Sequence, residues 1–106
     1  MIKRLFLLFT FTLLPAISLA DQKQVTVEIY KFAFTPQEIT ISPGTTVRWF
    51  NKEKRQYHSV WFEQLGEPEP DYLFPDDSYD RKFDKTGSFP YRCGPHPKMT
   101  GVVHVK

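Results

Sequence analysis

The chain has 106 residues, of which 41% are hydrophobic and 25% are charged, and it contains one cysteine. This length allows one small domain, and the single cysteine excludes an internal disulfide. The formal net charge of +2 is small, and the chain lacks the interleaved basic and aromatic residues of nucleic-acid binders. We therefore expect no nucleic-acid partner.

The N-terminus has the pattern of a secretory signal peptide. Two basic residues precede an apolar run over residues 5–14, and Ser18 and Ala20 are the small residues that a signal peptidase requires. A membrane anchor is the alternative, but the run is shorter than the ~20 residues that cross a bilayer. We expect residues 1–20 to be removed, which leaves a periplasmic domain over residues 21–106 without stable membrane insertion.

The rest of the chain shows the period-two alternation of short strands, and no stretch of ten residues shows helical periodicity. Residues 63–77 are rich in proline and acidic residues and predict a loop. Seven or eight short strands separated by turns are typical of an all-β Greek-key β-sandwich. The predicted strands, in chain order, are 25–30, 38–41, 46–50, 58–62, 78–83, 88–93 and 100–105.

The turn before the last predicted strand carries three side chains that bind metals. Cys93, His96 and Met99 have the spacing Cys-x2-His-x2-Met, and Pro95 and Pro97 restrict the backbone between them. A thiolate, an imidazole and a thioether form a soft ligand set that suits copper better than zinc, calcium or magnesium. The alternative is a buried thiol, a surface histidine and a core methionine that happen to be neighbours. It explains each residue alone but not the three together.

One more imidazole would complete a His2Cys trigonal site with a weak axial methionine, which is the ligand set of blue-copper electron-transfer centres. His58 is the candidate for that imidazole. His104 lies between Val103 and Val105, and strand alternation places it on the opposite face, toward solvent. We therefore expect His58, and not His104, to be the fourth ligand.

These residues resemble the small bacterial cupredoxins, which are type 1 blue copper proteins. The segments that carry the resemblance are Phe34-Thr35-Pro36-Gln37-Glu38-Ile39, residues 43–51, His58-Ser59-Val60 and residues 83–103. The two residues between His96 and Met99 are similar to the short ligand turn of amicyanin and not to the longer turn of plastocyanin.

The resemblance implies a Greek-key sandwich with one type 1 copper bound by His58, Cys93, His96 and Met99. It implies a one-electron carrier and not an enzyme, with donor and acceptor proteins such as a cytochrome or a periplasmic dehydrogenase. We expect a monomer. The resemblance also implies that the Asn51 side chain ties the two ligand loops together near the thiolate.

Several alternatives stay open at the level of sequence. The first is a copper-binding carrier or chaperone, although chaperones favour exposed, exchangeable sites. A copper enzyme would need a second metal centre with its own histidines. The acidic residues between 63 and 80 predict either a solvated loop or a docking patch for a cationic partner. Around His96 we expect an apolar rim of Pro95, Pro97 and Phe34 that suits transient docking.

Overall fold

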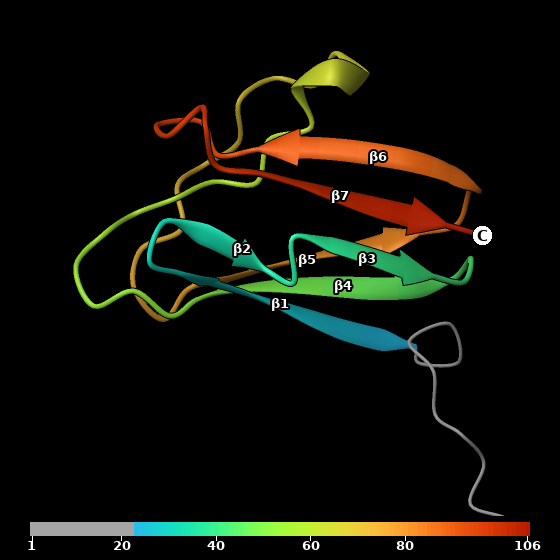
Figure 1. Ribbon diagram of the computed structural model, residues 1–106, viewed down its shortest axis with the longest axis horizontal. Coiled ribbons are helices and arrows are strands. Elements are labelled where there is room, and N and C mark those ends of the chain that lie inside the picture. Colours follow the sequence, from blue (N-terminus) through green and yellow to red (C-terminus); the bar gives the residue numbers. More distant parts are fainter. Residues whose placement is uncertain (1–22) are drawn as a thin grey trace, which may run out of the picture.

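The computed structural model describes residues 23–106, which form seven strands in two facing sheets (Figure 1). This arrangement is the predicted all-β sandwich. The predicted signal peptide over residues 1–20 lies outside the described residues. Within residues 23–106, no helix is long and apolar enough to cross a membrane. The first sheet has the order β2 (Ala33–Thr35), β1 (Gln24–Tyr30), β4 (Thr45–Asn51) and β5 (Ser78–Phe83). The second has the order β3 (Glu38–Ile41), β7 (Thr100–Val105) and β6 (Gly87–Arg92).

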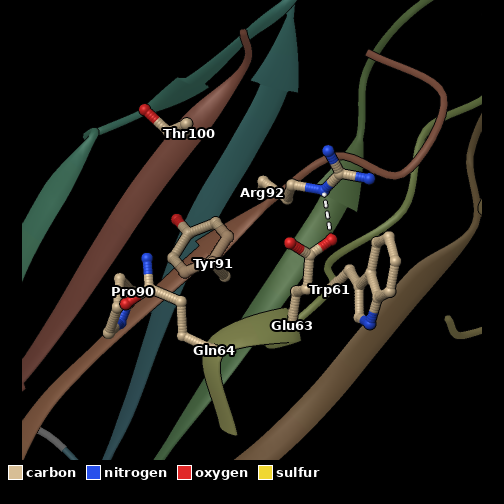
Figure 2. A pocket seen from close by; sticks show the side chains of 7 residues that line it. All are labelled: Trp61, Glu63, Gln64, Pro90, Tyr91, Arg92 and Thr100. Carbon is tan, nitrogen blue, oxygen red and sulfur yellow. Dashed lines mark ion pairs between the residues drawn. The ribbon is translucent and has the colours of Figure 1, made fainter. Parts of the chain in front are cut away.

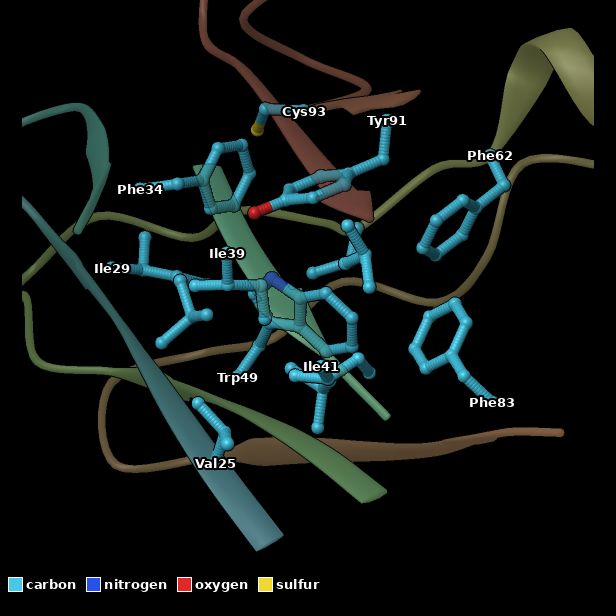
Figure 3. Packing of buried hydrophobic residues seen from close by; sticks show 14 of the residues in the cluster. Val25, Ile29, Phe34, Ile39, Ile41, Trp49, Phe62, Phe83, Tyr91 and Cys93 are labelled. Atoms are coloured by element: carbon cyan, nitrogen blue, oxygen red, sulfur yellow. The ribbon is translucent and has the colours of Figure 1, made fainter. Parts of the chain in front are cut away.

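Alternating side chains fill the space between the sheets. Along β1 every second residue is buried, as the sequence predicts for a half-buried strand. Trp49 in β4 has no exposed surface and packs against Phe62, Phe83 and Tyr91 (Figure 3), and it also stacks on Tyr79; the ring centroids are 5.3 to 6.3 Å apart. Tyr91 is the second-last residue of β6, so this aromatic core holds the end of that strand and supports the residues that follow it.

Six of the seven predicted strands are confirmed to within one residue at each end, but the strand predicted over residues 58–62 is wrong. This segment makes only two isolated bridges, from His58 to Leu73 and from Trp61 to Arg92. Because Arg92 belongs to the second sheet and Leu73 to a loop, the segment changes partner after three residues and pairs continuously with neither. Strand β2 was not predicted, and residues 63–77 include the short 3-10 helix η2 (Glu63–Leu65).

Three connections meet at one end of the sandwich, on the left in Figure 1. They are the turn between β1 and β2, the loop that follows β4, and the turn between β6 and β7. The third of these connections contains Cys93, His96 and Met99, and the second leads directly into His58. All four predicted ligands are therefore delivered to the same end of the fold.

Candidate metal centre

The turn from Cys93 to Met99 is closed by its own backbone. The N–H of Cys93 donates to the carbonyl of Met99 at 2.9 Å, and the N–H of Met99 donates to the carbonyl of His96 at 2.9 Å. Cys93 is fully buried, Met99 is buried, and His96 is half-buried. With Pro95 and Pro97 also limiting backbone rotation, the turn holds its side chains in one arrangement.

His58 reaches the site from the loop that follows β4. Its backbone exchanges two hydrogen bonds with Leu73, at 3.0 and 2.7 Å. The next residue, Ser59, fastens this segment to the ligand turn: its N–H donates to the Cys93 sulfur at 3.4 Å, and its hydroxyl oxygen accepts from the N–H of Gly94 at 2.8 Å. Ser59 was not among the predicted site residues. The only signal for it was its position next to His58.

The donor atoms of three predicted ligands converge. The Cys93 sulfur lies 3.6 Å from Nδ1 of His58 and 3.4 Å from Nδ1 of His96, and these three donor atoms all lie within 4.8 Å of one another. One ion bound at about 2.0 Å from nitrogen and 2.3 Å from sulfur would leave such donors about 3.5 Å apart. The observed spacing therefore fits three ligands of a single metal ion.

Burial sets the protonation of these groups in the metal-free protein. Burial, and then the neighbouring His96, lower the pKa of His58 below its ordinary value. Burial raises the pKa of the Cys93 thiol, although the N–H of Ser59 partly offsets this effect. Metal-free His58 and Cys93 are therefore both neutral near pH 7. Because neither carries a positive charge, a cation meets no repulsion from them.

Arg92, the residue before Cys93, is held in place by contacts with Trp61 and Glu63. Arg92 and Trp61 exchange backbone hydrogen bonds at 2.8 and 3.0 Å, and the Arg92 guanidinium lies 4.5 Å from the centroid of the Trp61 ring. Its Nε also pairs with Glu63 at 3.2 Å, beside a small surface pocket (Figure 2). These contacts fix the end of β6, and with it the starting point of the ligand turn.

Two other predicted positions lie apart from the cluster. His104 is on the outer face of its sheet, where Nδ1 contacts the Ser88 hydroxyl at 2.8 Å and Nε2 contacts Glu38 at 3.1 Å, as its strand parity predicted. The role expected for Asn51 needs correction. Its amide nitrogen donates to the carbonyls of Gln56 and Leu73, each at 2.9 Å, so it organises the loop before His58. Ser59, and not Asn51, joins the two ligand segments.

An apolar hollow lies beside His96. It is lined by Phe32, Pro95, His96, Pro97, Lys98 and Met99. The predicted rim included Phe34, but Phe34 is only 3% exposed and packs on Tyr91 at 4.8 Å between ring centroids. Phe32 takes the expected place. It is 49% exposed and meets the His96 ring edge-on, with 5.0 Å between centroids.

The family described as "Copper binding proteins, plastocyanin/azurin family" matches residues 21–106. The chain belongs to this copper-binding family. It is 37% identical to amicyanin from Paracoccus versutus over 77% of this chain and 64% of that protein. It is 34% identical to amicyanin-alpha from Methylorubrum extorquens, over 88% of this chain and 81% of that protein. A solved structure of a reduced amicyanin mutant superposes with a TM-score of 0.72 and 31% identity, covering 78% of this chain and 82% of that one.

Proposed function

We propose that this protein is a type 1 copper protein that carries single electrons between redox proteins, with copper held by His58, Cys93, His96 and Met99. The observation that carries the proposal is the convergence of one buried thiol and two imidazole nitrogens, with 3.4 and 3.6 Å between sulfur and nitrogen. Bound copper supplies a one-electron redox couple. Met99, buried at the end of the same turn, would supply its thioether sulfur as the fourth ligand.

The surrounding protein keeps the donor atoms in place. An electron carrier works best when its ligands move little between the two oxidation states, and a site built on braced elements meets that need. The ligand turn is anchored by β6 and β7, and Ser59 ties it to His58. His96 is the half-buried ligand that lines the apolar hollow, so electrons enter and leave beside it.

The exposed surface beside His96 suits brief contact with a redox partner. Phe32, Pro95 and Pro97 give this face apolar area without a deep cleft, as expected for weak electron-transfer encounters. The partners in this proposal are donor and acceptor proteins in the periplasm, where the protein acts as a monomer. The periplasmic location rests on the expected cleavage of residues 1–20.

The ion pairs of the acidic residues between 63 and 80 favour a solvated loop over a docking patch for a cationic partner. Acids already paired within the protein offer less charge to a cationic partner. Three of these acidic residues pair with arginines: Glu63 with Arg92, Glu67 with Arg81, and Asp80 with Arg48.

A copper carrier or chaperone is the second candidate. It requires a site that releases its metal readily, whereas Cys93 and His58 have no exposed surface. A copper enzyme with a second centre would need further histidines. The sequence has three, and His104 is engaged by Ser88 and Glu38. The burial of Cys93 and His58 therefore favours electron transfer over a carrier, and the small number of histidines favours it over an enzyme with a second metal centre.

Optical and EPR spectra of the chain from residue 21 onward, loaded with Cu(II), test the proposal. An intense visible band from thiolate to copper is expected, and Cys93→Ser should abolish it. His104→Ala is the control and should leave the band unchanged. A colourless protein that binds only Cu(I) would support the carrier instead, and bleaching by His104→Ala but not by His58→Ala would refute the ligand assignment.

A further inference from the structure

Glu53 is a largely buried carboxylate that is absent from the proposed ligand set. It lies in the loop between β4 and His58, and its side chain is only 10% exposed, whereas Lys52 and Lys54 on either side are exposed. A buried charge is costly unless polar groups compensate it. Oε1 of Glu53 accepts a hydrogen bond from the N–H of Phe32 at 2.9 Å and lies 3.4 Å from Nε2 of His58.

The contact with His58 concerns the imidazole nitrogen that faces away from the thiol. Nδ1 of His58 lies toward the Cys93 sulfur, which leaves Nε2 on the outer side of the ring. Nε2 is buried and makes no hydrogen bond of ordinary geometry within residues 23–106, and the Glu53 carboxylate oxygen 3.4 Å away is the acceptor toward which its N–H can donate. A carboxylate in this position fixes the tautomer and the ring orientation of a ligating histidine.

The contact with Phe32 holds a strained turn. Lys31 and Phe32 connect β1 and β2 with φ values of 51° and 57°, a left-handed region that is unfavourable for residues other than glycine. Such a conformation persists only where the surrounding structure enforces it. Here the turn presents the Phe32 ring edge-on to two imidazoles, with 5.5 Å between centroids to His58 and 5.0 Å to His96.

We propose that Glu53 is a positioning residue that clamps the strained turn at Lys31 and Phe32 onto His58, so that the Phe32 ring confines both imidazoles. The Glu53 carboxylate then fixes His58 through Nε2, while the Phe32 ring limits the rotation of both His58 and His96. The inference deepens the proposed function by taking both histidines as copper ligands, but the clamp itself can be measured without metal.

Hydrogen exchange and nitrogen NMR of the copper-free protein test the clamp directly. Glu53→Ala should speed exchange of the Phe32 amide at least tenfold and should mix the two tautomers of His58. Glu53→Gln should change that exchange less than threefold, because its amide oxygen can accept the same hydrogen bond. Glu38→Ala is the matched control: Glu38 contacts Nε2 of His104 at 3.1 Å, away from the metal turn, so its loss should alter neither readout.

The copper-loaded protein separates the charge of Glu53 from its geometry. Glu53→Gln should keep the visible band and raise the reduction potential, because the lost negative charge favoured Cu(II). Phe32→Leu keeps the backbone hydrogen bond but loses the ring, and it should broaden the distribution of copper hyperfine couplings in EPR. Should Glu53→Ala fail to fold, these two variants carry the test.

Two results would overturn the clamp. The first is a Glu53→Ala protein in which the hydrogen exchange of the Phe32 amide and the His58 tautomer are both unchanged. The second is an unaltered reduction potential in Glu53→Gln together with an unaltered EPR spectrum in Phe32→Leu. In either case a blue wild-type protein would still support the proposed function. A wild type without the thiolate band would refute that function, while the exchange measurements would still decide on the clamp.

Discussion

Replacing Gly101 with alanine should strongly destabilise the protein, because the ring of Tyr91 occupies the space of the new methyl group. Gly101 in β7 pairs with Tyr91 in β6. A Cβ on Gly101 would lie 2.8 Å from Cε2 of Tyr91 and closer still to Cζ and Oη. The ring cannot easily move aside, since it packs on Phe34, Trp49 and Phe62 with centroids 4.8 to 5.4 Å away.

Overpacking of this kind typically costs about 1–3 kcal/mol. Because the clash involves several atoms of a confined ring, we expect a loss near 3 kcal/mol, against a total stability of about 5–15 kcal/mol for a small domain. Urea unfolding of the copper-free protein measures this loss. With copper, the visible band of Gly101→Ala should also shift, since Tyr91 lies two residues before Cys93.

A double-mutant cycle makes the reasoning refutable. Tyr91→Leu keeps an apolar side chain in the core but removes the ring atoms that cover Gly101. In that background Gly101→Ala should cost less than about 0.5 kcal/mol, which gives a coupling of about 2.5 kcal/mol between the two positions. Equal costs in both backgrounds would show that the ring is not the cause.

Three further predictions concern protons and copper. Because burial raises the pKa of Cys93, binding of Cu(II) at about pH 7.5 should release about one proton, measurable by calorimetry in buffers of different ionisation enthalpy. No release would mean that the free protein already holds a thiolate. Because the pKa of His58 is lowered on folding, the unfolded chain binds more protons below about pH 6.5. The free energy of unfolding of the copper-free protein should therefore decrease as the pH falls below that value, and less steeply in His58→Gln. Removal of copper should lower the melting temperature, since the metal binds the folded donor array more tightly than the open chain, and equal melting temperatures would argue against a preformed site.

Local patterns in the sequence predicted much of the fold and of the site. Alternation located six strands, because one face of each is buried, and the spacing of Cys93, His96 and Met99 placed those residues on one turn. Features that depend on distant partners were not predictable in this way. The segment beginning at His58 alternates like a strand, yet it contacts a loop first and the second sheet afterwards.

The prediction placed Phe34 at the hollow beside His96, where the structure places Phe32. This error has a similar origin. Two consecutive residues with positive φ reverse the chain between β1 and β2, and neither is glycine or asparagine, so no turn signal marked the position. Ser59 and Glu53 were missed because a serine and a glutamate near a ligand gain a role only through what the folded chain places beside them.

The spacing of the ligands along the chain also bears on how copper and folding are linked. Three of the proposed ligands lie within seven residues, whereas Cys93 and His58 are 35 residues apart. Each doubling of a loop costs about 0.6 kcal/mol in closure entropy, so recruiting His58 costs an open chain about 1.5 kcal/mol more than closing the turn.

An unfolded chain can therefore bind copper through Cys93, His96 and Met99 alone, and metal bound in that state offsets part of the stabilisation that copper gives to the fold. The increase in melting temperature that copper gives then depends on what folding adds to the metal site of the open chain, namely the His58 ligand and the exclusion of water. A His58→Ala protein that keeps three ligands would still take up copper, but it would lose most of the stability that copper confers.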